Sequence, residues 1–286
     1  MGESMIKITT DSTSDLPIEL IKKYNIPVLP LVVTLGENDY FDDGVEVTEE
    51  KIFDFVKETK TLPKTAARSS EVYKDFFNEQ LKSCDEVIHI GIGEKLSSSY
   101  QNAVNAAEEI GGGKVNVIES MTLSTGIGLL VLQACKMAEE GKSSKEICER
   151  LNYLAPKGQT SFVVDKLDYL YKGGRCSKFS FSIGSLLKIK PRLQLIDGAI
   201  VNTGKDLGTL RAVLRKYVDY ELSKYSNIID DTVFITHTQM DQQIVNELID
   251  YVKSKKIFKN VLESEAGSVI TSHCGPGTLG ILYLCD

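Results

Sequence analysis

The sequence predicts an α/β protein in which an N-terminal, mostly parallel sheet with flanking helices packs against a second α/β domain. From residue 5 to about 165, short apolar runs alternate with segments of helical periodicity, which is the pattern of βα units around a parallel sheet. At 286 residues, the chain is also longer than one typical domain. We therefore expect two domains, residues 1–160 and 161–286, with a ligand site in the crevice between them.

Four apolar runs of the N-terminal part are predicted strands: MIKITTDS, EVIHIGI, KVNVIES and TSFVVD. Three segments between them have apolar residues at helical spacing and are predicted helices: SYQNAVNAAEEI, TLSTGIGLLVLQACKMAEE and SKEICERLNYL. Residues 27–45 are predicted to form a strand followed by a turn at Gly36, Glu37 and Asn38.

The C-terminal part begins with two strand-like runs around Asp197-Gly198, a pair of residues that favours a tight hairpin turn. A strand VFITHT, a helix from about Asp241 to Lys253 and a strand LGILYLC complete the predicted second layer. No internal repeat or low-complexity linker separates the two parts, so we expect them to pack closely.

Composition excludes several classes of protein. The net charge of −7, without a basic stripe, argues against nucleic acid as a partner. The first residues lack the apolar core of a signal peptide, and no run approaches the roughly 18 apolar residues of a membrane span. The cysteines contain no CxxC pair and suit small buried residues, which fits a reducing, cytoplasmic setting; they are Cys84, Cys135, Cys148, Cys176, Cys274 and Cys285.

Three hydroxyl-rich loops follow predicted strands and open predicted helices: Thr9–Ser14, Leu96–Ser99 and Glu119–Thr122. In a parallel sheet all three lie at the carboxyl edge, where open α/β sheets bind ligands. Their N–H groups and hydroxyls could together bind one anion. Each loop taken alone is more simply interpreted as a helix cap, and the two roles are compatible.

Hydrolase, nucleotide and metal sites have weaker support. No G-x-S-x-G motif is present, although Ser97, His273 and Asp11 could form a triad from distant loops. GGGKV and GIGEKL lack the spacing of phosphate-binding motifs. The histidines are far apart, with no acidic or thiol pair at ligand spacing, so neither a metal site nor a cofactor is predicted. His89 is interpreted as a core residue, and His237 as either structural or functional.

Three residues stand out as candidates for binding. His273 lies in SHCGPGTLG, where the glycines and proline predict a turn that holds an imidazole at a domain interface. Thr65 in KTAARSS is free for a ligand, because Ser69 or Ser70 is expected to cap the next helix. Arg175 follows two glycines in a predicted surface loop and is a candidate contact for a phosphate or carboxylate.

Seven segments in order along the chain resemble the DegV family, the bacterial fatty-acid-binding proteins that serve as the FakB subunit of fatty acid kinase. They are ITTDSTSDLP, IPVLPLVV, PKTAARSS, IGEKLSSSYQNA, YLYKGGRCSK, KIKPRLQLIDG and SHCGPGTLG. Their order and spacing over almost the whole chain are far more specific than any single motif.

The resemblance implies a long-chain fatty acid whose carboxylate is held by Thr65, Ser97 and His273. It implies supporting pocket residues Ser98, Ser120, Gly275 and Gly277. It also implies a separate kinase subunit that supplies ATP and phosphorylates the carboxylate, with Arg175 as its docking residue. The chain itself is then not an enzyme. It passes the acyl phosphate on to lipid synthesis, with an acyltransferase as a further candidate partner and transient membrane contact as a further expectation.

The sequence also departs from the family pattern. Ser98-Ser99 stands where the family usually has Gly-Thr, and Leu207 occupies a position where the family often carries an arginine associated with the kinase-facing surface. Binding is therefore a firmer expectation than coupling to a kinase. The alternatives are a serine/histidine-dependent hydrolase or acyltransferase, and a lipid-binding protein that is not coupled to a kinase.

Overall fold

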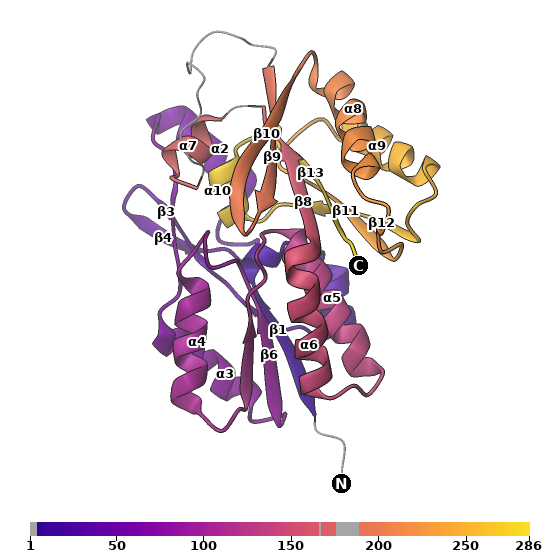
Figure 1. Cartoon of the computed structure of the whole chain (residues 1–286). Helices are drawn as coiled ribbons and strands as arrows, with labels where there is room; N and C mark the ends of the chain where they lie inside the picture. The colour runs from indigo at the N-terminus through magenta and orange to yellow at the C-terminus, as the bar shows by residue number, and fades with distance from the viewer. Residues whose placement is uncertain (1–4, 166, 176–188) are drawn as a thin grey trace.

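The computed structural model describes residues 5–165, 167–175 and 189–286 and contains three sheets (Figure 1). The first has the order β2-β1-β6-β7, and all its neighbouring strands are parallel, as expected. Its strands are β1 (Ile6–Asp11), β2 (Val28–Leu29), β6 (Glu86–Ile90) and β7 (Val115–Ile118). The fold is thus an α/β fold with a helix-flanked parallel sheet and a second, mixed sheet.

Helices flank the first sheet on both sides (Figure 1). On one side lie α3 (Ser70–Gln80) and α4 (Ser99–Ile110), and on the other α5 (Thr125–Glu139) and α6 (Ser144–Leu154). Two short helical turns and one helix complete this part: η1 (Ser12–Ser14), η2 (Ala155–Lys157) and α1 (Ile18–Lys23). The loops after β1, β6 and β7 share the carboxyl edge, which faces the second part of the molecule.

The second sheet has six strands in the order β10-β9-β8-β13-β11-β12. They are β8 (Gly158–Val163), β9 (Ile189–Ile196), β10 (Ala199–Leu207), β11 (Thr232–His237), β12 (Asn260–Glu265) and β13 (Leu279–Leu284). One face is covered by α8 (Leu210–Ser223) and α9 (Gln242–Ser254), with which it shares an apolar core. The predicted hairpin is confirmed: β9 and β10 pair antiparallel around Asp197 and Gly198, which both have positive φ.

The expectation that TSFVVD extends the first sheet was wrong. This segment forms β8, which lies between β9 and β13 in the second sheet and is antiparallel to both. A continuous apolar run indicates a strand buried on both faces but does not reveal its partners. The division of the chain at residue 160, which falls inside β8, stays a prediction.

A third, small antiparallel sheet has the order β4-β3-β5. Its strands are β3 (Val32–Leu35), β4 (Asn38–Phe41) and β5 (Lys64–Ala66), and the turn predicted at Gly36 joins the first two. Beside it lie α2 (Glu49–Thr59), α7 (Asp168–Lys172) and α10 (Ser268–Cys274). His273 therefore lies in the last turn of a helix and not in the Gly-Pro turn that we expected, which begins only at Gly275.

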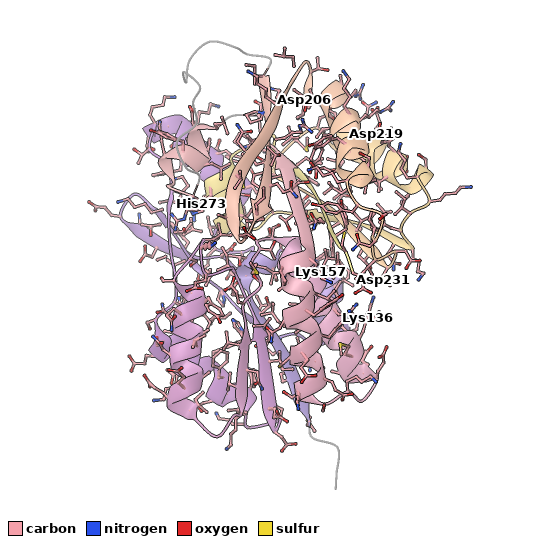
Figure 2. The ribbon with its side chains drawn as sticks, in the orientation of Figure 1. Lys136, Lys157, Asp206, Asp219, Asp231 and His273 are labelled. Atoms are coloured by element: carbon pink, nitrogen blue, oxygen red, sulfur yellow. The ribbon has the colours of Figure 1, made fainter. Side chains whose placement is uncertain are left out.

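Helix α5 joins the two parts, because its side chains contact both sheets. Ten of its 15 residues are buried, so it has no solvent face over most of its length. Its apolar residues share one core with Ile88 of the first sheet and Phe162 and Leu282 of the second. The Thr125 and Thr236 hydroxyls lie 2.5 Å apart, and Lys136 forms an ion pair with Asp231 (Figure 2).

The five cysteines within the described ranges are free thiols, and Cys176 lies outside those ranges. Across the described residues, no helix has both the length and the apolar character needed to cross a lipid bilayer.

Candidate functional site

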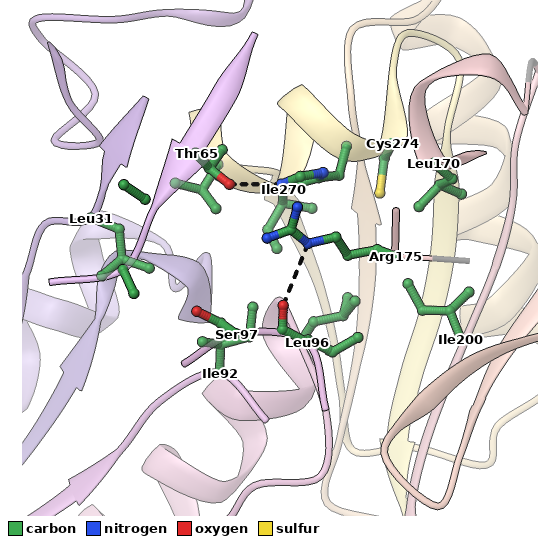
Figure 3. A pocket seen from close by; sticks show the side chains of 15 residues that line it. Leu31, Thr65, Ile92, Leu96, Ser97, Leu170, Arg175, Ile200, Ile270 and Cys274 are labelled. Atoms are coloured by element: carbon green, nitrogen blue, oxygen red, sulfur yellow. Dashed lines mark hydrogen bonds between the residues drawn. The ribbon is translucent and has the colours of Figure 1, made fainter. Parts of the chain in front are cut away.

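A narrow cavity lies between the carboxyl edge of the first sheet and the second sheet. Its empty volume, including its open mouth, is about 540 Å³, but only about 40 Å³ has room for the centre of a water molecule, so its side chains nearly fill it. Most of its lining is apolar: Leu31, Ala66, Ala67, Ile92, Leu96, Leu123, Leu170, Ile200, Val269, Ile270 and Cys274. The other four lining residues are Thr65, Ser97, Arg175 and His273 (Figure 3).

The three residues expected to hold a carboxylate line this one cavity from three different elements. Thr65 lies on the edge strand β5, Ser97 in the loop between β6 and α4, and His273 at the end of α10. Thr65 Oγ1 is 2.8 Å from His273 Nε2, although 208 positions separate the two residues. The pairing of β5 with β3 and the packing of α10 beside this small sheet bring them together.

The imidazole of His273 is held in its neutral form. Burial, reinforced by the Arg175 guanidinium, lowers the pKa of His273 from 6.5 to about 4. Its Nδ1 is buried without a hydrogen-bond partner, so Nε2 makes the ring's observed contact. If the proton is on Nε2, that group donates to Thr65 Oγ1, and the Thr65 hydroxyl can donate its own proton to an anion.

Ser97 both lines the cavity and serves the start of α4. Its Oγ accepts from the backbone N–H of Ser99 at 3.2 Å and donates to Ser99 Oγ at 3.0 Å. Ser98, the N-cap residue by position, makes no side-chain cap. A rotation about the Cβ–Oγ bond would redirect the Ser97 hydroxyl proton from Ser99 Oγ to a ligand, because hydroxyl hydrogens turn to suit their acceptors.

Arg175 lies inside the site and not on the outer surface where we expected it. Its side chain is partly buried, with Nη1 donating to the Gly173 carbonyl at 2.8 Å and Nε to the Leu96 carbonyl at 3.5 Å. Figure 3 shows the guanidinium reaching between Thr65 and Ser97. A fixed positive charge thus accompanies the two hydroxyls, and this combination suits an anion.

The four expected supporting residues do not line the cavity. Ser98 is exposed. Ser120 is buried, and its hydroxyl forms hydrogen bonds with the backbone of Thr122 in the same loop. Gly275 and Gly277 follow His273 with φ of +72° each, and a β-carbon on Gly275 would lie 2.6 Å from the Tyr169 ring. Gly275 and Gly277 instead allow the tight turn of the chain that directly follows α10.

Only one of the three expected edge loops contributes to the cavity lining. Leu96–Ser99 supplies Leu96 and Ser97, whereas no residue of Thr9–Ser14 or Glu119–Thr122 is a lining residue. Leu123, directly after the last of these loops, lines the cavity with an apolar side chain. The β1 loop reaches a different part of the molecule, the start of α10, through Asp15.

A second chamber of about 330 Å³ continues the cavity toward the second sheet. It shares Leu123, Ile270 and Cys274 with the first, and its further lining includes Phe162 and Leu282. Ser, Thr and His residues, His237 among them, also line this second chamber, although the surface that faces its interior is mainly apolar. Arg175 and the pair of Thr65 and His273 belong to the first chamber alone.

The alternative sites receive no support from the geometry of the described residues. Ser97 pairs with Ser99, His273 with Thr65, and Asp11 with Thr13 and the Ile92 N–H, so the triad of Ser97, His273 and Asp11 is not assembled. No cluster of His, Cys, Asp and Glu in the described ranges is arranged to hold a metal ion.

The other two histidines have structural partners. His89 is buried among Tyr73, Phe76 and Phe77, and burial lowers its pKa to about 3, as befits the expected core residue. His237 contacts Glu263 and the Thr238 carbonyl at 3.0 Å each.

The sequence reasoning missed the apolar lining, including Leu31, Leu170 and Ile270, and the inward position of Arg175. Nothing in the local sequence distinguishes these apolar residues from ordinary core residues. For Arg175, the preceding glycines indicated a loop, but not the direction in which the loop folds.

The fold and the site together define a class: a two-part α/β protein with two hydroxyls, an imidazole and a guanidinium beside a mainly apolar cavity. Residues 5–286 match the family model described as "Uncharacterised protein, DegV family". A DegV domain-containing protein of Caldanaerobacter subterraneus is 35% identical over 278 residues, covering 97% of this chain and 98% of that one. The chain belongs to the DegV family.

Solved structures agree with this assignment. A DegV family protein from Thermus thermophilus, described by its fatty acid binding, is 31% identical, with a TM-score of 0.90 and coverage of 99% and 100% of the two chains. A stearic-acid-binding protein from Eubacterium ventriosum is 29% identical, with a TM-score of 0.83 and 98% coverage of both chains. A Thermotoga maritima protein described as revealing a fatty acid binding function is 27% identical, with a TM-score of 0.84 and coverage of 99% and 100%.

Proposed function

We propose that this protein binds a long-chain fatty acid, with its carboxylate at Thr65, Ser97 and His273 and its tail in the apolar cavity. The observation that carries the proposal is the meeting of two hydroxyls, a neutral imidazole and a guanidinium beside a mainly apolar cavity. The fatty acids bound by the Thermus and Eubacterium relatives support it.

The tail supplies most of the affinity. Burying each methylene contributes about 0.8 kcal/mol, so a chain of about sixteen carbons contributes on the order of 12 kcal/mol before the losses of immobilisation. The cavity is narrow, so its apolar side chains must move apart to admit the tail.

The head group decides the orientation of the ligand. With the imidazole proton on Nε2, His273 donates to Thr65 Oγ1 and the Thr65 hydroxyl donates to one carboxylate oxygen, while Ser97 can donate to the other. Arg175 balances the negative charge, while the neutral imidazole adds no second cation. This arrangement binds an anion without a full lysine cage and is suited to releasing it.

The proposal is tested by mass spectrometry of the purified protein, in the native state and after organic extraction. We expect one long-chain fatty acid per chain, because the buried tail keeps the ligand bound through purification. A protein that carries none and also fails to take up added fatty acid would overturn the proposal.

We further propose that the bound acid is presented to a separate, ATP-dependent kinase subunit in the cytoplasm, which phosphorylates the carboxylate. The acyl phosphate is then carried onward to lipid synthesis, and an acyltransferase and transient membrane contact belong to the same proposal. A narrow, water-poor cavity would protect an acyl phosphate from hydrolysis. The guanidinium of Arg175 lies inside the polar end, so its proposed part in kinase docking is to meet the phosphate that the kinase delivers there.

Arg175→Ala is expected to keep fatty acid binding within about fivefold of wild type, because a partly exposed ion pair contributes about 0–1 kcal/mol. It is expected to lose ATP-dependent acyl phosphate formation by the cognate kinase subunit. Lys172→Ala, an exposed lysine three residues earlier, is the control. Normal turnover by Arg175→Ala would refute the docking role. If the wild-type protein is not turned over either, the protein binds lipid without being coupled to a kinase. Leu207, which stands where the family often has an arginine on the kinase-facing surface, favours that alternative.

A further inference from the structure

Helix α10, which carries His273, has no capping side chain of its own. It has seven residues, and Gly267 at its N-cap position supplies no side chain for its first N–H groups. An isolated helix of this length is not stable in water. Its place in the molecule must therefore be fixed by contacts from other elements.

Two carboxylates from the N-terminal half take the place of the cap. Asp15 Oδ1 accepts from the Gly267 N–H at 2.9 Å, and Asp42 Oδ1 accepts from the Ser268 N–H at 2.7 Å. Asp15 is anchored in turn by the Ser124 hydroxyl at the start of α5, at 2.5 Å. The start of α10 is thus tied to the central helix of the molecule.

A third carboxylate holds the middle of α10. Thr271, two residues before His273, donates from Oγ1 to Glu49 Oε1 at 2.6 Å. Glu49 is the first residue of α2, and the nearby Val47 carbonyl accepts from Ser268 Oγ at 2.8 Å. At the far end of α10, His273 reaches Thr65. Contacts therefore run along the whole helix and end at the imidazole.

We propose that Asp15, Asp42 and Glu49 are positioning residues for His273: their carboxylates fix α10 and thereby hold the imidazole against Thr65. None of them lines the first cavity; all three line a separate, open cleft on the other side of the start of α10, so they act on His273 through the helix. Their effect on the head group rests on the proposed fatty acid binding, whereas their effect on the imidazole does not.

Burying these three carboxyl groups costs free energy, which indicates that their role is to position α10. Burial raises the pKa of Asp15 and of Asp42, and raises that of Glu49 to about 7. No lysine or arginine among the described residues forms a salt bridge with these groups to offset that burial. A largely buried carboxylate without a cation costs free energy, and the hydrogen bonds that these three groups accept from α10 offset that cost.

The test follows the imidazole of His273 by NMR titration of the ligand-free protein, with His273→Gln to assign its signal among three histidines. In the wild type we expect a pKa of about 4. In Glu49→Ala and Asp42→Ala, a displaced α10 exposes the ring and moves its pKa up toward 6.5. Fatty acid affinity should fall by about tenfold or more in the same variants, the value of one hydrogen bond to a charged group.

The direction of the pKa change separates positioning from simple charge removal. Deleting a nearby negative charge would lower the pKa of an imidazole, and deleting a carboxyl that is already protonated would leave it unchanged; neither would raise it. In Glu49→Gln and Asp42→Asn the amide oxygen still accepts from α10, so both measurements should return close to wild type. Glu50→Ala is the matched control, because Glu50 is exposed in the same first turn of α2.

A folded Glu49→Ala protein in which His273 titrates as in the wild type would overturn the inference. If Asp42→Ala does not fold, Glu49→Ala decides alone, because Glu49 is only partly buried. The titration needs no fatty acid, so it gives its answer even if mass spectrometry shows that the protein binds none.

Discussion

The double substitution Thr65→Val and Ser97→Ala is expected to weaken fatty acid binding by about 10²- to 10⁴-fold, since each hydrogen bond to a carboxylate contributes about 1.5–3 kcal/mol. Both hydroxyls lie at the polar end of the cavity, and neither substitution removes apolar lining. Isothermal titration at neutral pH, where the acid is ionised, measures the change.

The methyl ester of the same acid separates the head group from the tail. It carries no charge, so the double variant should bind it about as well as the wild type does. Ser98→Ala removes an exposed hydroxyl next to Ser97 and should bind the acid normally. A well-folded double variant with unchanged affinity for the acid would exclude these residues from the site.

Gly275→Ala is expected to destabilise the fold by about 2–6 kcal/mol. Gly275 has φ 72° and ψ 177°, a conformation in which a residue with a side chain costs about 1–3 kcal/mol. A β-carbon there would also lie 2.6 Å from the Tyr169 ring, and overpacking of this kind typically adds about 1–3 kcal/mol. Urea unfolding monitored by circular dichroism measures the loss.

Gly111→Ala is the matched control for Gly275→Ala. Gly111 has nearly the same backbone, φ 71° and ψ −174°, but the nearest atom to its β-carbon position would be 3.9 Å away. It should therefore show the backbone cost alone. Equal losses in the two variants would mean that Tyr169 yields easily and that the tight turn does not constrain this side of the site.

The elements with clear start and stop signals could be predicted from the sequence. α6 begins at a Ser143–Glu146 capping box and α4 ends at Gly111, and the predicted bounds of both helices agree with the structure. The place of β8 could not be predicted, because burial on both faces does not specify which strands lie beside it. Pairing with β13 depends on a contact more than a hundred residues away along the chain.

The site could be predicted as a set of residues more readily than as a geometry. Thr65, Ser97 and His273 do line one cavity, but the glycine-rich segment after His273 suggested a turn at the position where α10 ends. This helix is short, lacks its own cap and depends on distant carboxylates, so its own sequence has little helical signal. The Arg175 side chain likewise points into the cavity because it donates hydrogen bonds to the Leu96 and Gly173 carbonyls.

The order of strands in the second sheet has a consequence for biosynthesis. β13 lies between β8 and β11 in the second sheet, and α10, which carries His273, comes just before it in sequence. Residues 268–284 therefore supply both a central strand of that sheet and the imidazole of the site. The first sheet, built from residues 6–118, can form while translation continues. A polypeptide interrupted before residue 268 would then hold a folded half whose apolar α5 residues lack the complete second sheet that covers them. Such a chain is a target for chaperones and proteases and, on the proposed function, does not bind a lipid.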